Sequence, residues 1–182
     1  MKSLRLVSLA AAAALALTAC SPDQAGTAAF VGNRRITSDQ LQGALDGLRK
    51  GNPQFAQVDQ LDQLVLFDLV AEPYLLAAAA KAGISVPAAQ AQAELPQTPH
   101  PNPEALRALR AQLALNLLKQ GQKDAELNTV AAQLRAVRIR VNPRYGRFDK
   151  AQLTITDAAP NWLAHPAAPA PTGAPTGAPP TG

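Results

Sequence analysis

Few side chains in this 182-residue sequence are suited to covalent or acid–base chemistry, and those few are far apart. Cys20 is the only cysteine, and His100 and His165 are the only histidines. A Ser–His–Asp triad needs a histidine that the fold holds rigidly, and a zinc site needs three or four converging ligands. His100 lies in a proline-rich segment and His165 in a segment rich in Pro and Ala. We therefore expect a protein that is not an enzyme and has no metal site.

Paired carboxylates occur twice in one apolar segment, as Asp59 with Asp62 and as Asp68 with Glu72. Such pairs can act as general acid and base. At these spacings, however, they also share one side of a helix, and on an amphipathic helix the polar side is solvated. We interpret both pairs as part of a solvated helix face. The sequence also has no glycine-rich loop of the kind that cradles phosphate groups.

The N-terminus has the three-part pattern of an export signal. Lys2 and Arg5 precede an apolar run over residues 6–17 that only Ser8 interrupts. A membrane-spanning helix needs about 20 apolar residues, so this run is too short to be one. Residues 1–19 are therefore predicted to be a signal peptide.

The end of this signal, Leu17-Thr18-Ala19-Cys20, resembles the lipobox of bacterial lipoproteins. The resemblance implies that the Cys20 thiol receives a diacylglyceryl group and becomes the new N-terminus, with no other cofactor. Membrane lipid then holds the chain on the extracytoplasmic face of the cell membrane. Two acyl chains anchor firmly, since each buried methylene contributes about 0.8 kcal/mol. The alternative is an ordinary secreted protein with a chance cysteine at the cleavage point.

Composition divides the rest of the chain into a leader, one domain and a tail. Residues 20–26 form a short polar leader that spans at most ~25 Å. Residues 27–159 have the ordinary length of one domain, which must fold on its apolar core because a single cysteine allows no intrachain disulfide. Residues 160–182 are mostly Pro, Ala, Gly and Thr and predict a disordered tail. A ligand for a proline-binding module and a spacer through a cell wall are the alternatives for the tail.

Positive charge is concentrated late in the domain. The formal net charge of +4 falls by two when the basic residues of the signal are removed. Against one acid, Asp149, residues 135–150 contain six basic side chains: Arg135, Arg138, Arg140, Arg144, Arg147 and Lys150. Nucleic acid is rarely met outside the cell membrane, so anionic phospholipid or a wall polymer is the partner that such a stripe would bind. We favour a solvated strand face, because Arg138 and Arg140 alternate with apolar residues.

Local signals predict the first strand and helix. Residues 28–31 are an apolar run that meets a turn signal, Gly32-Asn33. Thr37 and Gln40 have the spacing of a capping box. Apolar residues then recur with helical period until Gly51-Asn52-Pro53, which ends the helix.

Three further helices are expected in the middle of the domain. Residues 58–82 are apolar on more than one face, which predicts a central helix that Pro73 should kink. Residues 84–95 predict a short helix, and the four prolines of residues 96–103 predict a loop. A fourth helix starts at Asn102-Pro103-Glu104. It ends near Leu118 or continues past Gly121 to Leu134, and its leucines form one row: Leu106, Leu109, Leu113 and Leu117.

Strict alternation over residues 137–141 predicts a half-buried strand. Its obvious partner is the strand over residues 28–31. Residues 145–148 are expected to turn the chain, and residues 153–155 to add a short edge strand. The predicted fold class is mainly α, with four to five helices closed by a small antiparallel sheet that pairs the two ends of the domain.

Three motifs resemble, in their order, the N-terminal domain of SurA/PrsA-type extracytoplasmic chaperones, in the form found in actinobacterial lipoproteins. The first is Arg35-Ile36-Thr37 behind the Gly-Asn turn, and the second is Gly83-Ile84-Ser85-Val86. The third lies in residues 141–149, as Val-Asn-Pro-Arg-Tyr-Gly followed by Phe-Asp. The resemblance implies a helical domain, similar to that of trigger factor, that cradles unfolded exported chains.

Many members of this family also carry a parvulin prolyl-isomerase domain. Only 41 residues follow Val141, and about half of them belong to the tail. The isomerase activity is therefore not expected.

These observations predict a membrane-anchored holdase that binds exported polypeptides. The aromatic side chains to consider for client binding are Phe55, Phe67, Tyr74 and Trp162, although helical spacing favours core packing for Phe67 and Tyr74. The alternative is a structural or interaction lipoprotein that binds one specific envelope protein. A holdase accepts unrelated clients and a dedicated adaptor does not.

Overall fold

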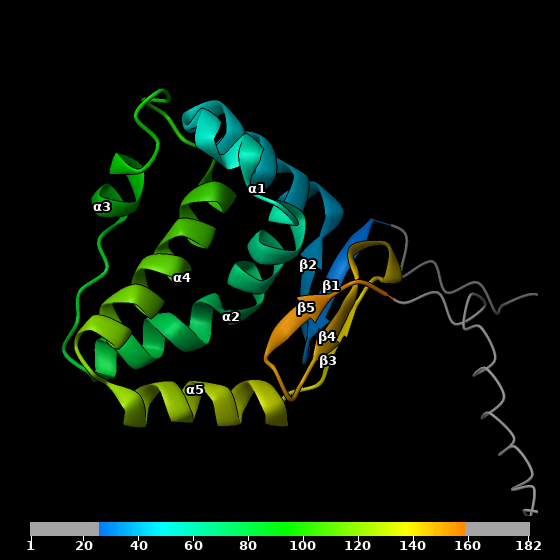
Figure 1. Cartoon of the computed structure of the whole chain (residues 1–182), viewed down its shortest axis with the longest axis vertical. Coiled ribbons are helices and arrows are strands. Elements are labelled where there is room, and N and C mark those ends of the chain that lie inside the picture. The colour runs from blue at the N-terminus through cyan, green and yellow to red at the C-terminus, as the bar shows by residue number, and fades with distance from the viewer. Residues whose placement is uncertain (1–25, 159–182) are drawn as a thin grey trace, which may run out of the picture.

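The computed structural model describes residues 26–158 (Figure 1). The predicted signal peptide over residues 1–19, the lipidation residue Cys20 and the tail over residues 160–182 lie outside this range, and so does Trp162. The statements about these segments therefore stay predictions.

The first and last parts of the described chain meet in a three-stranded antiparallel sheet of order β2-β1-β3. β1 (Thr27–Val31) turns directly into β2 (Arg34–Thr37), and β3 (Ile139–Val141) pairs with the other edge of β1. The predicted pairing of an N-terminal strand with a late strand is confirmed, with Ala29 opposite Val141. The sequence pattern did not predict β2, which gives β1 a second partner.

Helix α1 (Ser38–Gly51) begins where the capping box predicts. The Gln40 backbone N–H donates to the Thr37 hydroxyl at 3.1 Å, and the Thr37 N–H donates to the Gln40 side chain at 2.9 Å. Two N–H groups that the first helical turn leaves unpaired are thereby satisfied. Farther along α1, Gly47 allows close packing, since a Cβ there would lie 2.9 Å from the Ala105 side chain.

Helix α2 (Leu61–Lys81) is the central helix. It starts later than predicted, because a 3-10 helix over Pro53–Gln57 and a left-handed residue, Gln60 with φ 53°, come before it. By length and composition α2 could cross a membrane, but 56% of its most apolar window is buried inside the domain. The core helix of a folded domain passes the same test of length and composition.

Pro73 lies inside α2 without ending it. A proline cannot donate to the carbonyl four residues earlier, which here is that of Leu69. The guanidinium of Arg34, on β2, donates to the Leu69 carbonyl at 3.1 Å and to the Val70 carbonyl at 2.9 Å. Figure 1 shows α2 bending along its course, as the proline predicts. Arg34 thus provides donors for carbonyls at the proline bend.

Helix α4 (Pro103–Gln120) packs along α2. Its predicted start is confirmed, because the Asn102 side chain accepts a hydrogen bond from the Glu104 N–H at 2.8 Å. Of its leucine row only Leu109 is buried, and the other three members are partly buried. Small residues dominate the inner face, which consists of Ala105, Ala108, Leu109, Ala111, Ala114 and Leu118. Alanines let the two helices approach closely.

The two remaining helices flank this pair. α3 (Ala88–Ala93) is shorter than the predicted segment over residues 84–95 and packs against α4. α5 (Asp124–Ala136) is a separate helix, and the alternative that α4 continues past Gly121 is wrong. The chain turns between the two helices with Gln122 in the left-handed region, at φ 52°.

A second antiparallel sheet is formed by β4 (Arg147–Asp149) and β5 (Thr154–Thr156). The prediction that residues 145–148 only turn the chain is wrong, because most of them belong to a 3-10 helix ending at Tyr145 and to β4. Gly146, at φ +115°, allows β4 to start there, since a Cβ would collide with the Thr156 carbonyl oxygen.

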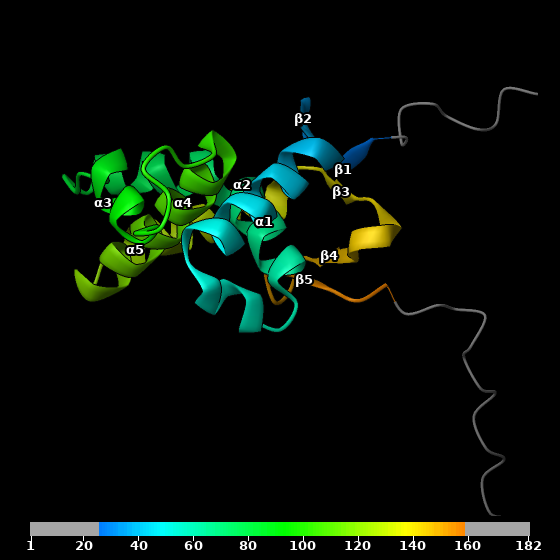
Figure 2. The ribbon, with the colours of Figure 1, turned by 90° about the horizontal axis from the view of Figure 1, so that it is seen from above.

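The fold class predicted from the sequence is confirmed. Helices α1, α2, α4 and α5 contribute to one apolar core, which small antiparallel strands also enter. Figure 2 shows the strands gathered at one end of the described domain and most of the helical mass at the other.

Candidate functional site

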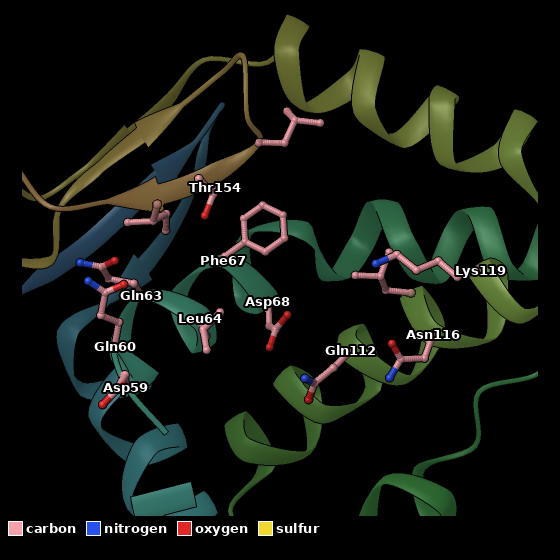
Figure 3. Close-up of a pocket in the computed structure, with 13 residues that line it drawn as sticks. Asp59, Gln60, Gln63, Leu64, Phe67, Asp68, Gln112, Asn116, Lys119 and Thr154 are labelled. Atoms are coloured by element: carbon pink, nitrogen blue, oxygen red, sulfur yellow. The ribbon is translucent and has the colours of Figure 1, made fainter. Parts of the chain in front are cut away.

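A hollow lies between α2, α4 and the β4–β5 hairpin and is named the central hollow (Figure 3). Its volume is about 420 Å³. Apolar, amide and charged side chains line it together: Asp59, Gln60, Gln63, Leu64, Phe67, Asp68, Gln112, Leu115, Asn116, Lys119, Leu153, Thr154 and Ile155. The hairpin is held at one end of the hollow, because the Gln63 side chain donates to the Asp157 carboxylate at 2.6 Å.

An apolar hollow of about 220 Å³ adjoins the first on the side of α5. All the side chains that line it are apolar: Phe67, Ala71, Leu75, Leu115, Leu127, Val130, Ala131, Leu134 and Leu153. Phe67, Leu115 and Leu153 also line the central hollow. These three side chains are therefore a wall that both hollows share.

A third hollow, of about 80 Å³, adjoins the central hollow on the side of the 3-10 helix over Pro53–Gln57. Its lining is Leu48, Phe55, Val58, Leu61, Leu64, Val65, Asp68, Ala108, Leu109 and Gln112. Leu64, Asp68 and Gln112 also line the central hollow. The three hollows thus adjoin in series, and together they are named the α2–α4 groove.

The groove wall contains apolar side chains that face water. Among the described residues, the large apolar side chains that count as exposed are Val58, 39% exposed, and Leu64, 49% exposed. Both line the groove. Apolar surface left in water forgoes about 25 cal/mol per Å² of burial, and such surface is characteristic of binding sites when it is clustered in a hollow. A ligand with apolar side chains would recover this free energy.

Asp68 is a carboxylate inside this groove. Figure 3 shows its side chain directed from α2 toward α4, near Gln112. Burial raises the pKa of Asp68 from 3.8 to about 7, because the protein around it displaces the water that stabilises the charged form. Other charged groups in the same lining are Asp59 and Lys119. The interpretation of Asp68 as part of a solvated helix face is wrong.

Glu72, the other half of that carboxylate pair, has a different role. It is buried and accepts hydrogen bonds from Arg107 of α4, the shortest at 2.6 Å. Arg107 also donates to Glu104 at 2.8 Å. The hydrogen bonds to Glu72 raise the pKa of Arg107 above its ordinary value. Glu72 is therefore a buried link between α2 and α4, and the solvated interpretation is wrong for this residue too.

The predicted client-binding residues divide between two places. Phe55 and Phe67 are half-buried and line the α2–α4 groove. Tyr74 lines a different hollow, of about 160 Å³, between α2 and α5. Trp162 lies outside the described residues, as does Cys20. The structure therefore brings Phe55 and Phe67 into one site and does not bring Tyr74 into it.

The remaining chemical candidates stay apart in the structure. His100 is exposed in the loop between α3 and α4, and His165 lies outside the described residues. Within residues 26–158, no three His, Cys, Asp or Glu side chains form a group that could hold a metal ion. Groove residues that the sequence analysis did not single out include Val58, Leu64, Leu115 and Leu153. No signal in the sequence marks Leu64, because its exposure depends on which segments pack against α2.

Comparisons with known proteins gave no match. No protein-family model matches the chain, and no curated protein and no solved structure matches it either. The resemblance to SurA/PrsA-type chaperone domains thus stays a prediction from the sequence motifs.

Proposed function

We propose that this protein is a lipid-anchored extracytoplasmic lipoprotein that holds unfolded exported polypeptides in the α2–α4 groove, without prolyl-isomerase activity. The observation that carries this proposal is the series of adjoining hollows, with the exposed Val58 and Leu64 in their lining. The motif resemblance to extracytoplasmic chaperone domains supports the same function. The predicted signal peptide and lipobox place the chain where exported polypeptides emerge.

The groove lining suits an unfolded chain. Unfolded chains present apolar side chains at irregular spacing together with backbone N–H and C=O groups that need partners. The hollow beside α5 accepts apolar side chains, and the amides of Gln112 and Asn116 in the central hollow can pair with a client backbone. A shallow groove buries limited apolar area at about 25 cal/mol per Å². We therefore expect weak, reversible binding, which allows a client to leave and fold.

The position of the domain supports early contact with clients. The described domain begins at Gly26, six residues after Cys20. An extended chain of that length spans roughly 20–25 Å. A lipid on Cys20 would therefore keep the groove close to the membrane from which exported chains emerge.

The polar centre of the groove favours a second candidate function. Asp68, Gln112 and Asn116 are hydrogen-bonding groups among apolar residues, and such groups orient a ligand in a pocket and make binding selective. A dedicated interaction lipoprotein would use them to recognise one envelope protein. Promiscuity separates the two functions.

The holdase function is tested by suppression of aggregation. The chain from residue 20, with Cys20→Ser to remove the lipid, is mixed with several unrelated denatured proteins, and light scattering is followed. We expect near-stoichiometric suppression for all of them. The double variant Val58→Lys with Leu64→Lys should lose most of the effect, because two ammonium groups would replace apolar wall. Ala80→Lys with Ala132→Lys adds the same charge at exposed helix positions outside the groove and should keep it.

Two outcomes would contradict parts of this proposal. Failure with every client would rule out a holdase and leave the dedicated partner as the function. Equal activity of the groove variant and its control would show that clients bind elsewhere.

The lipid anchor is tested separately in cells. Cys20→Ala should move the protein out of the membrane fraction or leave its signal peptide uncleaved. A Cys20→Ala protein that is processed and still retained in the membrane fraction would refute the anchor.

A further inference from the structure

The outer face of the three-stranded sheet carries arginine side chains around one aromatic ring. Phe30 of β1 lies opposite Arg35 of β2 and opposite Arg140 of β3. Directly opposed residues point to the same side of a sheet, so these three share one face. The other face is the buried one, with Ala29, Val31 and Ile36 in the core.

Contacts and exposure define this surface further. The Arg140 guanidinium lies 4.9 Å from the centroid of the Phe30 ring, which is within cation–π range. Arg138, two residues before Arg140, is exposed and falls on the same side by strand alternation. Phe30, Arg35, Arg138 and Arg140 together are named the basic sheet face. The three strands contain no Asp or Glu.

The structure separates members of the basic stripe of the sequence into different surroundings. Arg135 and Lys150 donate to each other's backbone carbonyls, at 3.3 and 3.0 Å, and so tie the β4–β5 hairpin to the end of α5. Arg138 and Arg140 belong instead to the basic sheet face, where Arg35 joins them from more than a hundred residues earlier in the chain. The surface is therefore a product of strand pairing and not only of a local run of charge.

The basic sheet face lies at the N-terminal end of the domain. A Cβ built on Gly26 would be 3.8 Å from the Arg35 guanidinium, so this arginine lies beside the point where the described chain begins. Figure 2 shows that β1 and β3 lie toward the end of the domain where the described chain begins. A surface in this place is the part of the domain that a membrane anchor at Cys20 brings nearest to the bilayer.

We propose that the basic sheet face binds the headgroups of anionic phospholipids, so that the domain lies with this sheet against the bilayer. The guanidinium groups of Arg138 and Arg140 lie on one side of strands that contain no Asp or Glu, so this face complements a surface of phosphates. Arginine pairs with phosphate through two parallel N–H donors. Each basic side chain near an anionic bilayer contributes about 1 kcal/mol. The lipid anchor proposed above would add to this binding, but the binding does not depend on it or on client binding.

Vesicle co-sedimentation tests the proposal without the anchor. The chain from residue 20 with Cys20→Ser is mixed with vesicles of phosphatidylcholine and phosphatidylglycerol, and with vesicles of phosphatidylcholine alone. We expect binding to the anionic vesicles only, and we expect salt to weaken it. Arg138→Gln with Arg140→Gln should lower the partition coefficient about 30-fold, the equivalent of two charges at about 1 kcal/mol each.

A matched control removes the same charge elsewhere. Arg49 and Lys50 are exposed at the far end of α1, and Arg49→Gln with Lys50→Gln should bind vesicles nearly as well as the parent. Thermal unfolding of each variant checks its folding, and Arg35→Gln provides an independent variant of the same face. Equal binding to both kinds of vesicle, or equal losses in the two double variants, would overturn the proposal. Binding to soluble polyphosphate without binding to vesicles would assign the face to a wall polymer and would also overturn it.

Discussion

The α2–α4 groove and the basic sheet face occupy the same small domain but place polar and apolar groups in opposite ways. The groove leaves Val58 and Leu64 in water and encloses a carboxylate, Asp68. The sheet turns Ala29, Val31 and Ile36 into the core, and its outer face carries exposed arginines around the half-buried Phe30 ring. The exposed apolar side chains and the buried carboxylate of the groove therefore lower the unfolding free energy of the domain, whereas the sheet face does not lower it.

This difference indicates which interactions would provide binding free energy at each of the two surfaces. A ligand in the groove gains free energy by covering apolar surface and by pairing with Asp68, whose pKa is raised by partial loss of water. A ligand on the sheet face gains mainly charge attraction, which salt screens. Variants should therefore change stability when they touch the supports of the groove, and change only binding when they touch the outer sheet face.

The largest effect is expected at the ion pair behind the groove. Arg107→Leu leaves the buried Glu72 carboxylate without its partner, and we expect unfolding free energy to fall by about 3 kcal/mol, at the low end for a broken buried pair because Arg107 is 33% exposed. Urea denaturation measures this loss. Glu72→Gln added to Arg107→Leu should restore part of it. Arg140→Leu on the sheet face is the control and should change the unfolding free energy by no more than about 0.5 kcal/mol. A loss there as large as in Arg107→Leu would contradict the difference between the groove and the sheet face.

A smaller effect separates two adjacent arginines of β2. Arg34→Ala removes the donors to the Leu69 and Val70 carbonyls at the proline bend, and we expect a loss of about 2 kcal/mol. Arg35→Ala, on the outer face, should cost roughly 0.5 kcal/mol. Thermal unfolding of the two variants under identical conditions decides the matter. Equal losses would show that the hydrogen bonds of Arg34 to α2 contribute nothing measurable to the unfolding free energy.

The smallest effect is a pH dependence that belongs to Asp68. Its pKa is raised in the folded state from 3.8 to about 7, so between these values the folded protein binds the extra proton. Unfolding free energy should therefore fall as pH rises from about 4 to about 7, and then level off. The groove is open to water, which screens part of the shift, so we expect about 1–2 kcal/mol of the ~4 kcal/mol that full burial would give.

Asp68→Asn should remove this component of the pH profile, and it should stabilise the protein at neutral pH. Asp59→Asn, which removes an exposed carboxylate from the same lining, is the control and should leave the component in place. Urea titrations at several pH values measure both. A profile for Asp68→Asn that parallels the parent would show that Asp68 is well solvated.

Local signals predicted the elements whose boundaries depend on near neighbours. The capping box at Thr37 and Gln40 placed the start of α1, and Asn102 placed the start of α4. The alternation around Arg138 and Arg140 predicted β3, although the regular strand is shorter than the pattern. Each of these signals acts through contacts within a few residues, so one stretch of sequence contains all that is needed.

The groove was predicted only in part, because its walls come from separate segments. Phe55 and Phe67 were named from their aromatic character, but nothing local joined them to Leu115 of α4 or Leu153 of the hairpin. Tyr74 had the same character and lies in another hollow. Aromatic identity indicates burial or binding without saying which neighbours share the site.

The sequence by itself determined the fold class, the starts of α1 and α4, and the pairing of β1 with β3, because hydrophobic period, caps and alternation are properties of short segments. Only the tertiary structure decided that Asp68 faces a groove while Glu72, four residues later, is tied to Arg107. It also placed Arg34 against α2, and Arg35 and Arg140 on either side of Phe30. The physical reason is the same in each case: the free energy of a charged side chain depends on which distant segment packs against it.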